Sequence, residues 1–127
     1  MANKKELQYQ IVGQHTEKVN QILNIELLTG DICMYPGFPK HIKKRHENCL
    51  HYIPDIPDII ANPDYVGINP NEPDSVEYVK LYNENILVSV NLCKAKEEDY
   101  LFVSSLYDIS NAKLSNRINS GRLKKYI

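Results

Sequence analysis

The sequence predicts an α+β fold in which N-terminal helices pack on one face of an antiparallel sheet. Two observations lead to this prediction. Apolar residues recur at helical spacing mainly in the first half of the chain, and alternating strand-like segments follow in the second half. The 127 residues suffice for one modest hydrophobic core, so we expect a single domain over residues 1–127.

The first third of the chain predicts a strand, a helix and a second strand. Residues 7–12 (LQYQIV) are apolar and partly alternating, as is typical of a short strand. Residues 15–28 place apolar side chains near helical spacing, and Thr29-Gly30 ends that helix. Residues 32–35 are rich in strand-forming side chains and predict another short strand.

Prolines organise the next part of the chain. Pro39 suits the first position of a helix, which we expect to run to about Leu50. Residues 52–74 contain five of the seven prolines, each of which removes a backbone donor and restricts the preceding residue. We therefore expect only one short helix there, around Ile56 to Ile60.

The second half of the chain predicts an antiparallel meander. Residues 86–93 alternate as a half-buried strand does, and residues 76–82 precede them across the turn Asn83-Glu84-Asn85, which indicates a hairpin. The segment 100–107 (YLFVSSLY) predicts a third strand, and a helix up to Asn119 follows it. With helices on one face, the other face of the sheet would be free for a ligand.

The net charge of −1 predicts no partner by itself, but the charges are segregated. Residues 55–99 carry ten acids against three lysines, whereas residues 113–127 carry five cations and no acid. A second basic cluster occupies residues 40–46. Such segregation creates local positive fields that attract polyanions. A solvated helix face with a disordered basic tail explains the same pattern, and both interpretations stay open.

The segment GFPKHIKKRH, residues 37–46, concentrates cations and imidazoles. A zinc site is disfavoured, because His41 and His46 are five residues apart instead of four. Cys49 is a conceivable nucleophile beside His46 or His51, but a lone cysteine is more often a small buried hydrophobe. We therefore expect no metal and no other cofactor.

Phosphodiester chemistry fits this segment better. Cleavage of RNA without a metal needs a general base for the 2′-hydroxyl, a general acid for the leaving oxygen and cations for the phosphoryl oxygens. Histidine carries protons near neutral pH, and arginine clamps phosphate with a planar fork. His41 and Arg45 share one helix face. If the helix frays at His46, both imidazoles can reach one groove.

The segment PGFPKHIKKRH, followed by IPDIPDIIANPDYVG, resembles the phage-associated branch (PBECR) of the barnase–EndoU–colicin–RelE (BECR) nuclease superfamily. The shared pattern is an H-x-x-x-R-H helix, a short helix ending at an Asn-Pro-Asp turn, and a strand hairpin. A strand with a small hydroxyl residue and an aromatic follows, here FVSSLY. The resemblance is strongest over residues 32–107.

The resemblance implies an α+β nuclease fold and metal-independent cleavage of RNA, as in toxins or phage-delivered polyvalent proteins. Carried over by position, it implies the following catalytic residues: His41, Arg45, His46, Ser105 and Tyr107. Ser104 matches almost as well as Ser105. Strand alternation groups Ser105 with Val103 and Tyr107, so we favour Ser105, whose hydroxyl would share a groove with Tyr107.

Charge alone extends the predicted site to RNA- and phosphate-binding cations: Lys40, Lys43, Lys44, Arg122 and Lys124. The last two lie in the basic segment 110–127, outside the matched pattern, where a disordered tail is an equal reading. RNA is the expected partner, together with a neutralising antitoxin or immunity protein. A non-catalytic phage-encoded module that binds nucleic acid or protein is the alternative function.

Several features predict an intracellular, cytoplasmic location, and the resemblance implies a bacterial host cell and delivery by a phage. No apolar run approaches the ~18 residues of a spanning helix, so no membrane partner is expected. The basic pair near the N-terminus has no apolar segment behind it, unlike a secretory signal. The three cysteines are odd in number and widely spaced, which indicates reduced thiols.

Overall fold

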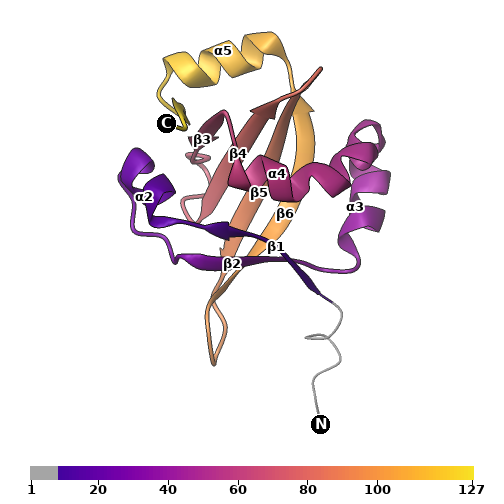
Figure 1. Ribbon diagram of the computed structural model, residues 1–127, viewed down its shortest axis with the longest axis vertical. Coiled ribbons are helices and arrows are strands. Elements are labelled where there is room, and N and C mark those ends of the chain that lie inside the picture. The colour runs from indigo at the N-terminus through magenta and orange to yellow at the C-terminus, as the bar shows by residue number, and fades with distance from the viewer. Residues whose placement is uncertain (1–8) are drawn as a thin grey trace.

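The computed structural model describes residues 9–127, and within them seven strands form one sheet (Figure 1). The start of the predicted strand 7–12 lies outside the described residues. The strands are β1 (Gln10–His15), β2 (Gly30–Met34), β3 (Tyr65–Gly67), β4 (Ser75–Leu81), β5 (Asn85–Cys93), β6 (Tyr100–Ile109) and β7 (Leu123–Lys125).

The helices are α2 (Glu17–Leu23), α3 (Phe38–Arg45), α4 (Ile56–Ala61) and α5 (Asn111–Asn119), with a 3-10 helix, η1 (Glu47–Asp55), between α3 and α4. This mixture of helices and one sheet is consistent with the predicted α+β class. Of the helices described, none combines the length and the apolarity needed to cross a bilayer.

The strand order is β1-β2-β6-β5-β4-β3-β7, and β4, β5 and β6 form the predicted meander. The prediction of a wholly antiparallel sheet is wrong at one place in the described chain, where β2 and β6 run parallel and pair only at Ile32–Leu101 and Cys33–Phe102. Parallel neighbours need a long connection. Here the connection between β2 and β6 includes three helices and three strands, so no local sequence pattern could predict that these two strands pair.

Two predicted helices are shorter than expected. The helix predicted over 15–28 ends at Leu23, because Asn24 adopts a left-handed conformation with φ 55° and closes the last turn. The helix predicted over 39–50 ends at Arg45, and the chain continues as the 3-10 helix η1. The short helix predicted around Ile56 to Ile60 is confirmed as α4.

β3 and β7 were not predicted from the sequence, because strands of three residues are too short to show an alternating pattern. β3 pairs with β4 on one side and with β7 on the other, so each strand exists through its neighbours. The reading of the basic C-terminus as a disordered tail is therefore wrong for residues 123–125.

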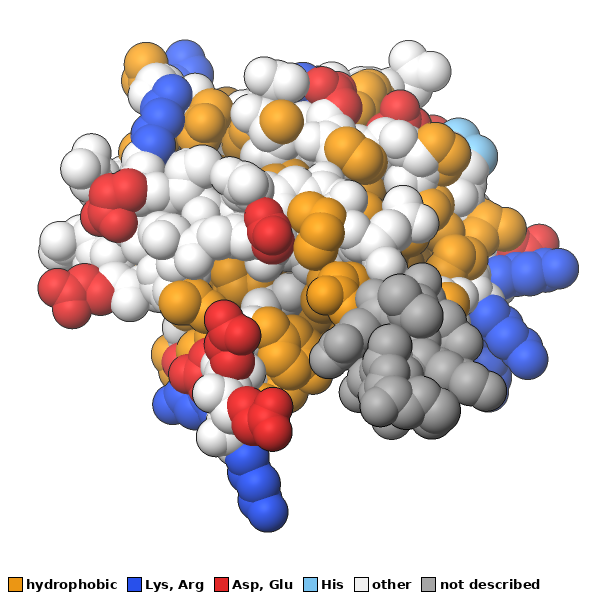
Figure 2. All heavy atoms as spheres, turned by 60° about the horizontal axis from the view of Figure 1, so that its bottom comes forward, with side chains coloured by type: hydrophobic (Ala, Val, Ile, Leu, Met, Phe, Trp, Pro, Cys, Tyr) orange, Lys and Arg blue, Asp and Glu red, His pale blue; other side chains and the backbone are white. Residues whose placement is uncertain are grey.

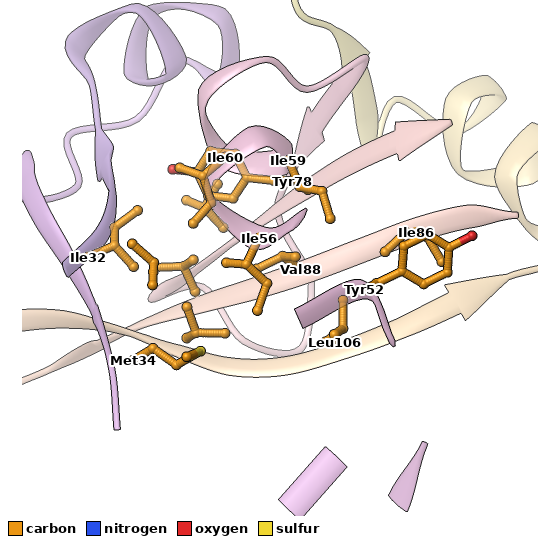
Figure 3. Close-up of a cluster of buried hydrophobic side chains, with 14 of the residues drawn as sticks. Ile32, Met34, Tyr52, Ile56, Ile59, Ile60, Tyr78, Ile86, Val88 and Leu106 are labelled. Carbon is orange, nitrogen blue, oxygen red and sulfur yellow. The ribbon is translucent and has the colours of Figure 1, made fainter. Parts of the chain in front are cut away.

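One face of the sheet carries the main core (Figure 3). Side chains from α2, α3, η1 and α4 pack there against β-strand side chains that include Val88 and Leu106. Ile56 and Ile59 of α4 are fully buried, and each such burial stabilises the fold by about 1.5–3 kcal/mol.

The opposite face carries a smaller cluster. Leu87 belongs to this cluster while its neighbour Val88 belongs to the main core, because successive strand residues point to opposite faces. Leu114 and Ile118 of α5 pack against this second cluster. Helix packing is thus not limited to one face of the sheet, and α5 covers part of the face that was expected to be free.

Candidate active-site cleft

Helix α3 lies beside β6, at the place that β2 leaves open (Figure 1). β2 pairs with β6 only at the start of that strand, so the later residues of β6 have no partner on this side within the described chain. Phe38 and Ile42 are buried and anchor α3 on the main core. His41 and Arg45 are exposed, so the amphipathic helix presents imidazole and guanidinium groups beside β6.

Helix α3 ends directly before His46, which carries the second imidazole. Arg45 is the last helical residue, and His46 leaves the helix with φ −143° and ψ 57° while its N–H still donates to the carbonyl of Ile42. The helix was expected to continue to about Leu50, and its end at Arg45 meets the condition under which both imidazoles can reach one groove. The His46 ring lies 5.6 Å from the Tyr107 ring, measured between centroids, so the end of α3 contacts β6.

A β-bulge in β6 sets the position of the two serines. Ser89 of β5 pairs with Ser105, and the ladder then skips Ser104 and continues at Val103. The extra residue shifts the alternation, so Val103 and Leu106 are both in the main core. The prediction that Ser105 shares a face with Val103 is therefore wrong, and both serines line the opposite face.

These elements enclose one cleft of about 340 Å³. Its wall contains all five residues that the sequence suggested for catalysis, His41, Arg45, His46, Ser105 and Tyr107, and also Ser104. The remaining wall residues are Asn69, Glu72, Glu77, Ser89 and Asn91. Residues from α3, β4, β5, β6 and the loop before β4 thus meet at one concave surface.

The two serines differ in their hydrogen bonds. The Ser104 hydroxyl donates to Oδ1 of Asn91 at 2.7 Å, which fixes it against β5. Within residues 9–127, no hydrogen bond engages the Ser105 hydroxyl, which remains available to a ligand in the cleft.

An ion pair closes the floor of the cleft. Arg122 donates from Nε and Nη2 to the two carboxylate oxygens of Glu77, at 2.9 and 2.7 Å. The Glu77 side chain is 2% exposed, and the bond to Glu77 raises the pKa of Arg122. Such a two-pronged pair is among the stronger charge-assisted contacts in proteins.

Gly67 allows this pair to form. Gly67 of β3 pairs with Glu77 on one side and with Leu123 on the other. A Cβ at position 67 would collide with the carbonyl oxygen of Arg122. Only glycine therefore lets the start of β7 approach closely enough for Arg122 to reach Glu77.

Other predicted phosphate ligands lie outside the cleft wall. Lys40, Lys43 and Lys44 are exposed on α3, the helix that also carries His41 and Arg45. Lys124 is exposed on the edge strand β7. Arg122 already holds Glu77 with two of its three nitrogens, so its geometry is that of an ion-pair partner instead of a free phosphate clamp.

Sequence reasoning missed five residues of the cleft wall: Glu77, Ser89, Asn91 and the loop residues Asn69 and Glu72. Glu77 had a signal, since it is a lone acid within the apolar strand sequence VEYV, at a position that alternation assigns to the face opposite Val76 and Tyr78. The sequence carried no comparable signal for the other four.

The other reactive groups near α3 are poorly suited to catalysis. Cys49 is buried, and burial followed by the nearby Asp108 raises the pKa of its thiol to about 11. A thiolate, the nucleophilic form, is therefore disfavoured. Asp108 accepts a hydrogen bond from Asn48, which lowers the pKa of its carboxyl. In the described part of the chain, no three His, Cys, Asp or Glu side chains converge as a metal site would require.

Comparison with known proteins identifies one family. The model of the family described as "phage-Barnase-EndoU-ColicinE5/D-RelE like nuclease3" matches residues 10–116. The match extends beyond the segment 32–107 on both sides and includes every cleft residue, but it ends before Arg122. No curated protein and no solved structure matches the chain.

Proposed function

The chain belongs to this phage-associated nuclease family, and on that premise we propose that it is a metal-independent endoribonuclease. The observation that supports the proposal is the single cleft in which imidazoles and a guanidinium from α3 meet hydroxyls from β6. These are the groups that cleavage by attack of the 2′-hydroxyl requires.

In the proposed reaction, one of the two imidazoles of His41 and His46 takes the proton of the 2′-hydroxyl. The 2′-oxygen forms a bond to phosphorus while the bond from phosphorus to the 5′-oxygen breaks, and the other imidazole protonates that leaving oxygen. The products are a 2′,3′-cyclic phosphate and a 5′-hydroxyl. Which imidazole is the base is left to experiment.

The other cleft residues would stabilise charge and position the substrate. Arg45 neutralises the negative charge that accumulates on the phosphoryl oxygens, and the free Ser105 hydroxyl donates a hydrogen bond to the same group. Tyr107 lies against His46 and orients its ring. The Glu77 carboxylate is held in place by its two hydrogen bonds from Arg122 and would help to shape the polar wall of the cleft.

Substrate attraction would come from the exposed lysines of α3: Lys40, Lys43 and Lys44. Neutralising RNA phosphates releases counterions, so affinity falls steeply as salt rises. Lys124, which lies on the far edge strand, contributes only to the general field. An active ribonuclease in the bacterial cytoplasm damages its host. A toxin role, with a neutralising protein as partner or delivery by a phage, follows from this activity.

The test is cleavage of a mixed RNA pool in the presence of EDTA. We expect the wild type to cleave and the variant His46→Ala to lose cleavage. His51→Ala is the matched control, because His51 is an exposed histidine outside the cleft wall, and it should keep full activity. Loss of cleavage on adding EDTA would indicate a metal-dependent hydrolase. Binding of RNA without any cleavage would identify a non-catalytic module.

A further inference from the structure

The sheet face that carries the cleft is divided into three zones along its strands. At one end α5 covers the small cluster around Leu87 and Ile109. The middle zone is the polar cleft, with Glu77, Ser89 and Ser105 paired across three strands. The third zone lies towards the hairpin between β5 and β6 and carries aromatic side chains.

This third zone, which we call the aromatic platform, consists of four rings: Tyr9, Tyr35, Tyr100 and Phe102. Tyr35 lies 6.3 Å, between centroids, from each of the other three rings, and Tyr100 lies 6.2 Å from Phe102. The interplanar angles run from 53° to 77°. Because these rings meet edge to face or tilted, they do not stack on one another.

The platform is only partly shielded from solvent. All four rings are half-buried, in contrast to the core side chains on the other face of the same strands. Ile11, which pairs with Cys33 at the sheet edge, is 50% exposed. Figure 2 turns the bottom of Figure 1 towards the reader, and on that side hydrophobic side chains lie among charged ones. Partly exposed aromatic side chains can stack with the bases of a ligand.

The platform continues directly from the cleft. Phe102 pairs with Asn91 across β6 and β5, and Asn91 is a cleft residue whose carboxamide accepts from Ser104. Cys33, on the other side of Phe102, belongs to the same row of side chains. A strand of RNA that leaves the cleft along β6 therefore meets Phe102 first and Tyr35 and Tyr100 next.

We propose that the aromatic platform binds the one or two unpaired bases of RNA next to the scissile phosphate, by stacking. The proposal rests on the proposed ribonuclease function. Stacking on aromatic side chains is how proteins hold unpaired bases with little regard to sequence. The basic side chains of α3, which begins three residues after Tyr35, neutralise the adjoining phosphates.

The surrounding charges limit the length of this track. The hairpin beyond Tyr100 carries three acids, Glu97, Glu98 and Asp99, against two lysines. These acids repel further phosphates, so the track ends after the rings. The binding advantage of longer RNA should accordingly stop rising once the platform is filled.

The experiment measures kcat/KM for mixed-sequence RNA of two to eight nucleotides. For the wild type we expect about a tenfold or greater rise between the dinucleotide and about the tetranucleotide, followed by a plateau. In the double variant Tyr100→Leu and Phe102→Leu, which keeps apolar bulk but removes the π-faces, that rise is lost while dinucleotide cleavage is unchanged. Phe102→Tyr keeps an aromatic face and should retain the rise.

The same length dependence in the wild type and the double variant would overturn the platform while leaving the nuclease intact. If the wild type cleaves no RNA, fluorescence anisotropy of the same labelled oligonucleotides decides the matter. Binding that weakens in the double variant keeps the platform and rejects the proposed catalysis, and equal binding rejects the platform. If the melting temperature of the double variant is well below that of the wild type, Tyr35→Leu replaces it in both the cleavage and the binding experiments.

Discussion

Two histidine-containing regions of this protein are built in opposite ways. His15 is 1% exposed, and both of its ring nitrogens are occupied, Nδ1 by the hydroxyl of Tyr78 at 2.6 Å and Nε2 by Oδ1 of Asn20 at 2.6 Å. His41 and His46 instead line an open cleft, and among the described residues no hydrogen bond engages their rings.

The difference separates a structural imidazole from one that is available for chemistry. Burial lowers the pKa of His15, so it stays neutral, donates from Nε2 to Asn20 and accepts from Tyr78 at Nδ1. Asn20 extends this network, because its Nδ2 donates a hydrogen bond to the carbonyl oxygen of Leu27. A fully satisfied buried network specifies the fold, whereas unoccupied nitrogens at a concave polar surface can exchange protons with a ligand.

The largest expected effect on RNA cleavage comes from removing the two histidines of the cleft. Replacing both His41 and His46 with alanine removes the proposed acid and base, and we expect RNA cleavage to fall by about 10²–10⁴-fold or more. The melting temperature should stay close to that of the wild type, because neither ring holds a buried partner. A large loss of thermal stability in this variant would show that the cleft histidines are structural, and the comparison would break.

In the ion pair at the cleft, Glu77 is buried like His15, whereas its partner Arg122 is half-buried. Arg122→Ala leaves the Glu77 carboxylate without its partner, and we expect a cost of about 3 kcal/mol in the free energy of unfolding. Urea denaturation measures it. Lys124→Ala, two residues away on an exposed site, is the control and should change stability by less than about 0.5 kcal/mol. Equal effects would mean that Arg122 is no more than a surface cation.

Removing His15 should have the opposite effects: it lowers the stability of the fold and leaves RNA cleavage unchanged. In His15→Ala the Tyr78 hydroxyl and the Asn20 carboxamide lose their buried partner, which costs roughly 2–4 kcal/mol. Cleavage by the fraction that is folded should match the wild type, since the network lies in the core on the other face of the sheet. Activity lost without a fall in stability would contradict the assignment of His15 to the fold.

The pH dependence of stability sharpens the same contrast. The pKa of His15 is lowered in the folded state, so the unfolded chain binds more protons once the pH falls below the ordinary value of about 6.5. Stability from this site is fully present above that value and decreases as the pH falls through it. Melting temperatures from pH 8 to pH 5 should show the decrease in the wild type and less of it in His15→Asn.

The smallest effects concern the two serines of the bulge. Ser104→Ala removes a hydrogen bond to Asn91 and should cost about 1 kcal/mol in stability, with little effect on cleavage. Ser105→Ala should leave stability unchanged and reduce kcat, because its hydroxyl is free for the substrate. The reverse pattern, measured by melting and by cleavage of the same RNA, would assign Ser104 to the site.

Much of the candidate site was predictable because its residues are local in sequence. His41, Arg45 and His46 lie within six consecutive residues, so their closeness follows from the sequence, although the end of the helix at Arg45 was not predicted. Glu77 and Arg122 were not assigned as a pair, because they are 45 residues apart and meet only when β3 joins β4 to β7. The bulge at Ser104 was also invisible, since it is a property of pairing with β5.

The sequence by itself determined the α+β class, the meander of β4, β5 and β6, and the chemistry carried by α3, because these depend on periodicity and on neighbouring residues. The tertiary structure alone decided which face each serine lines, where α5 packs and how the C-terminus orders as β7. The physical reason is that a strand's partners, its bulges and the burial of a charged pair arise from contacts between distant segments, and such contacts leave no period in the chain.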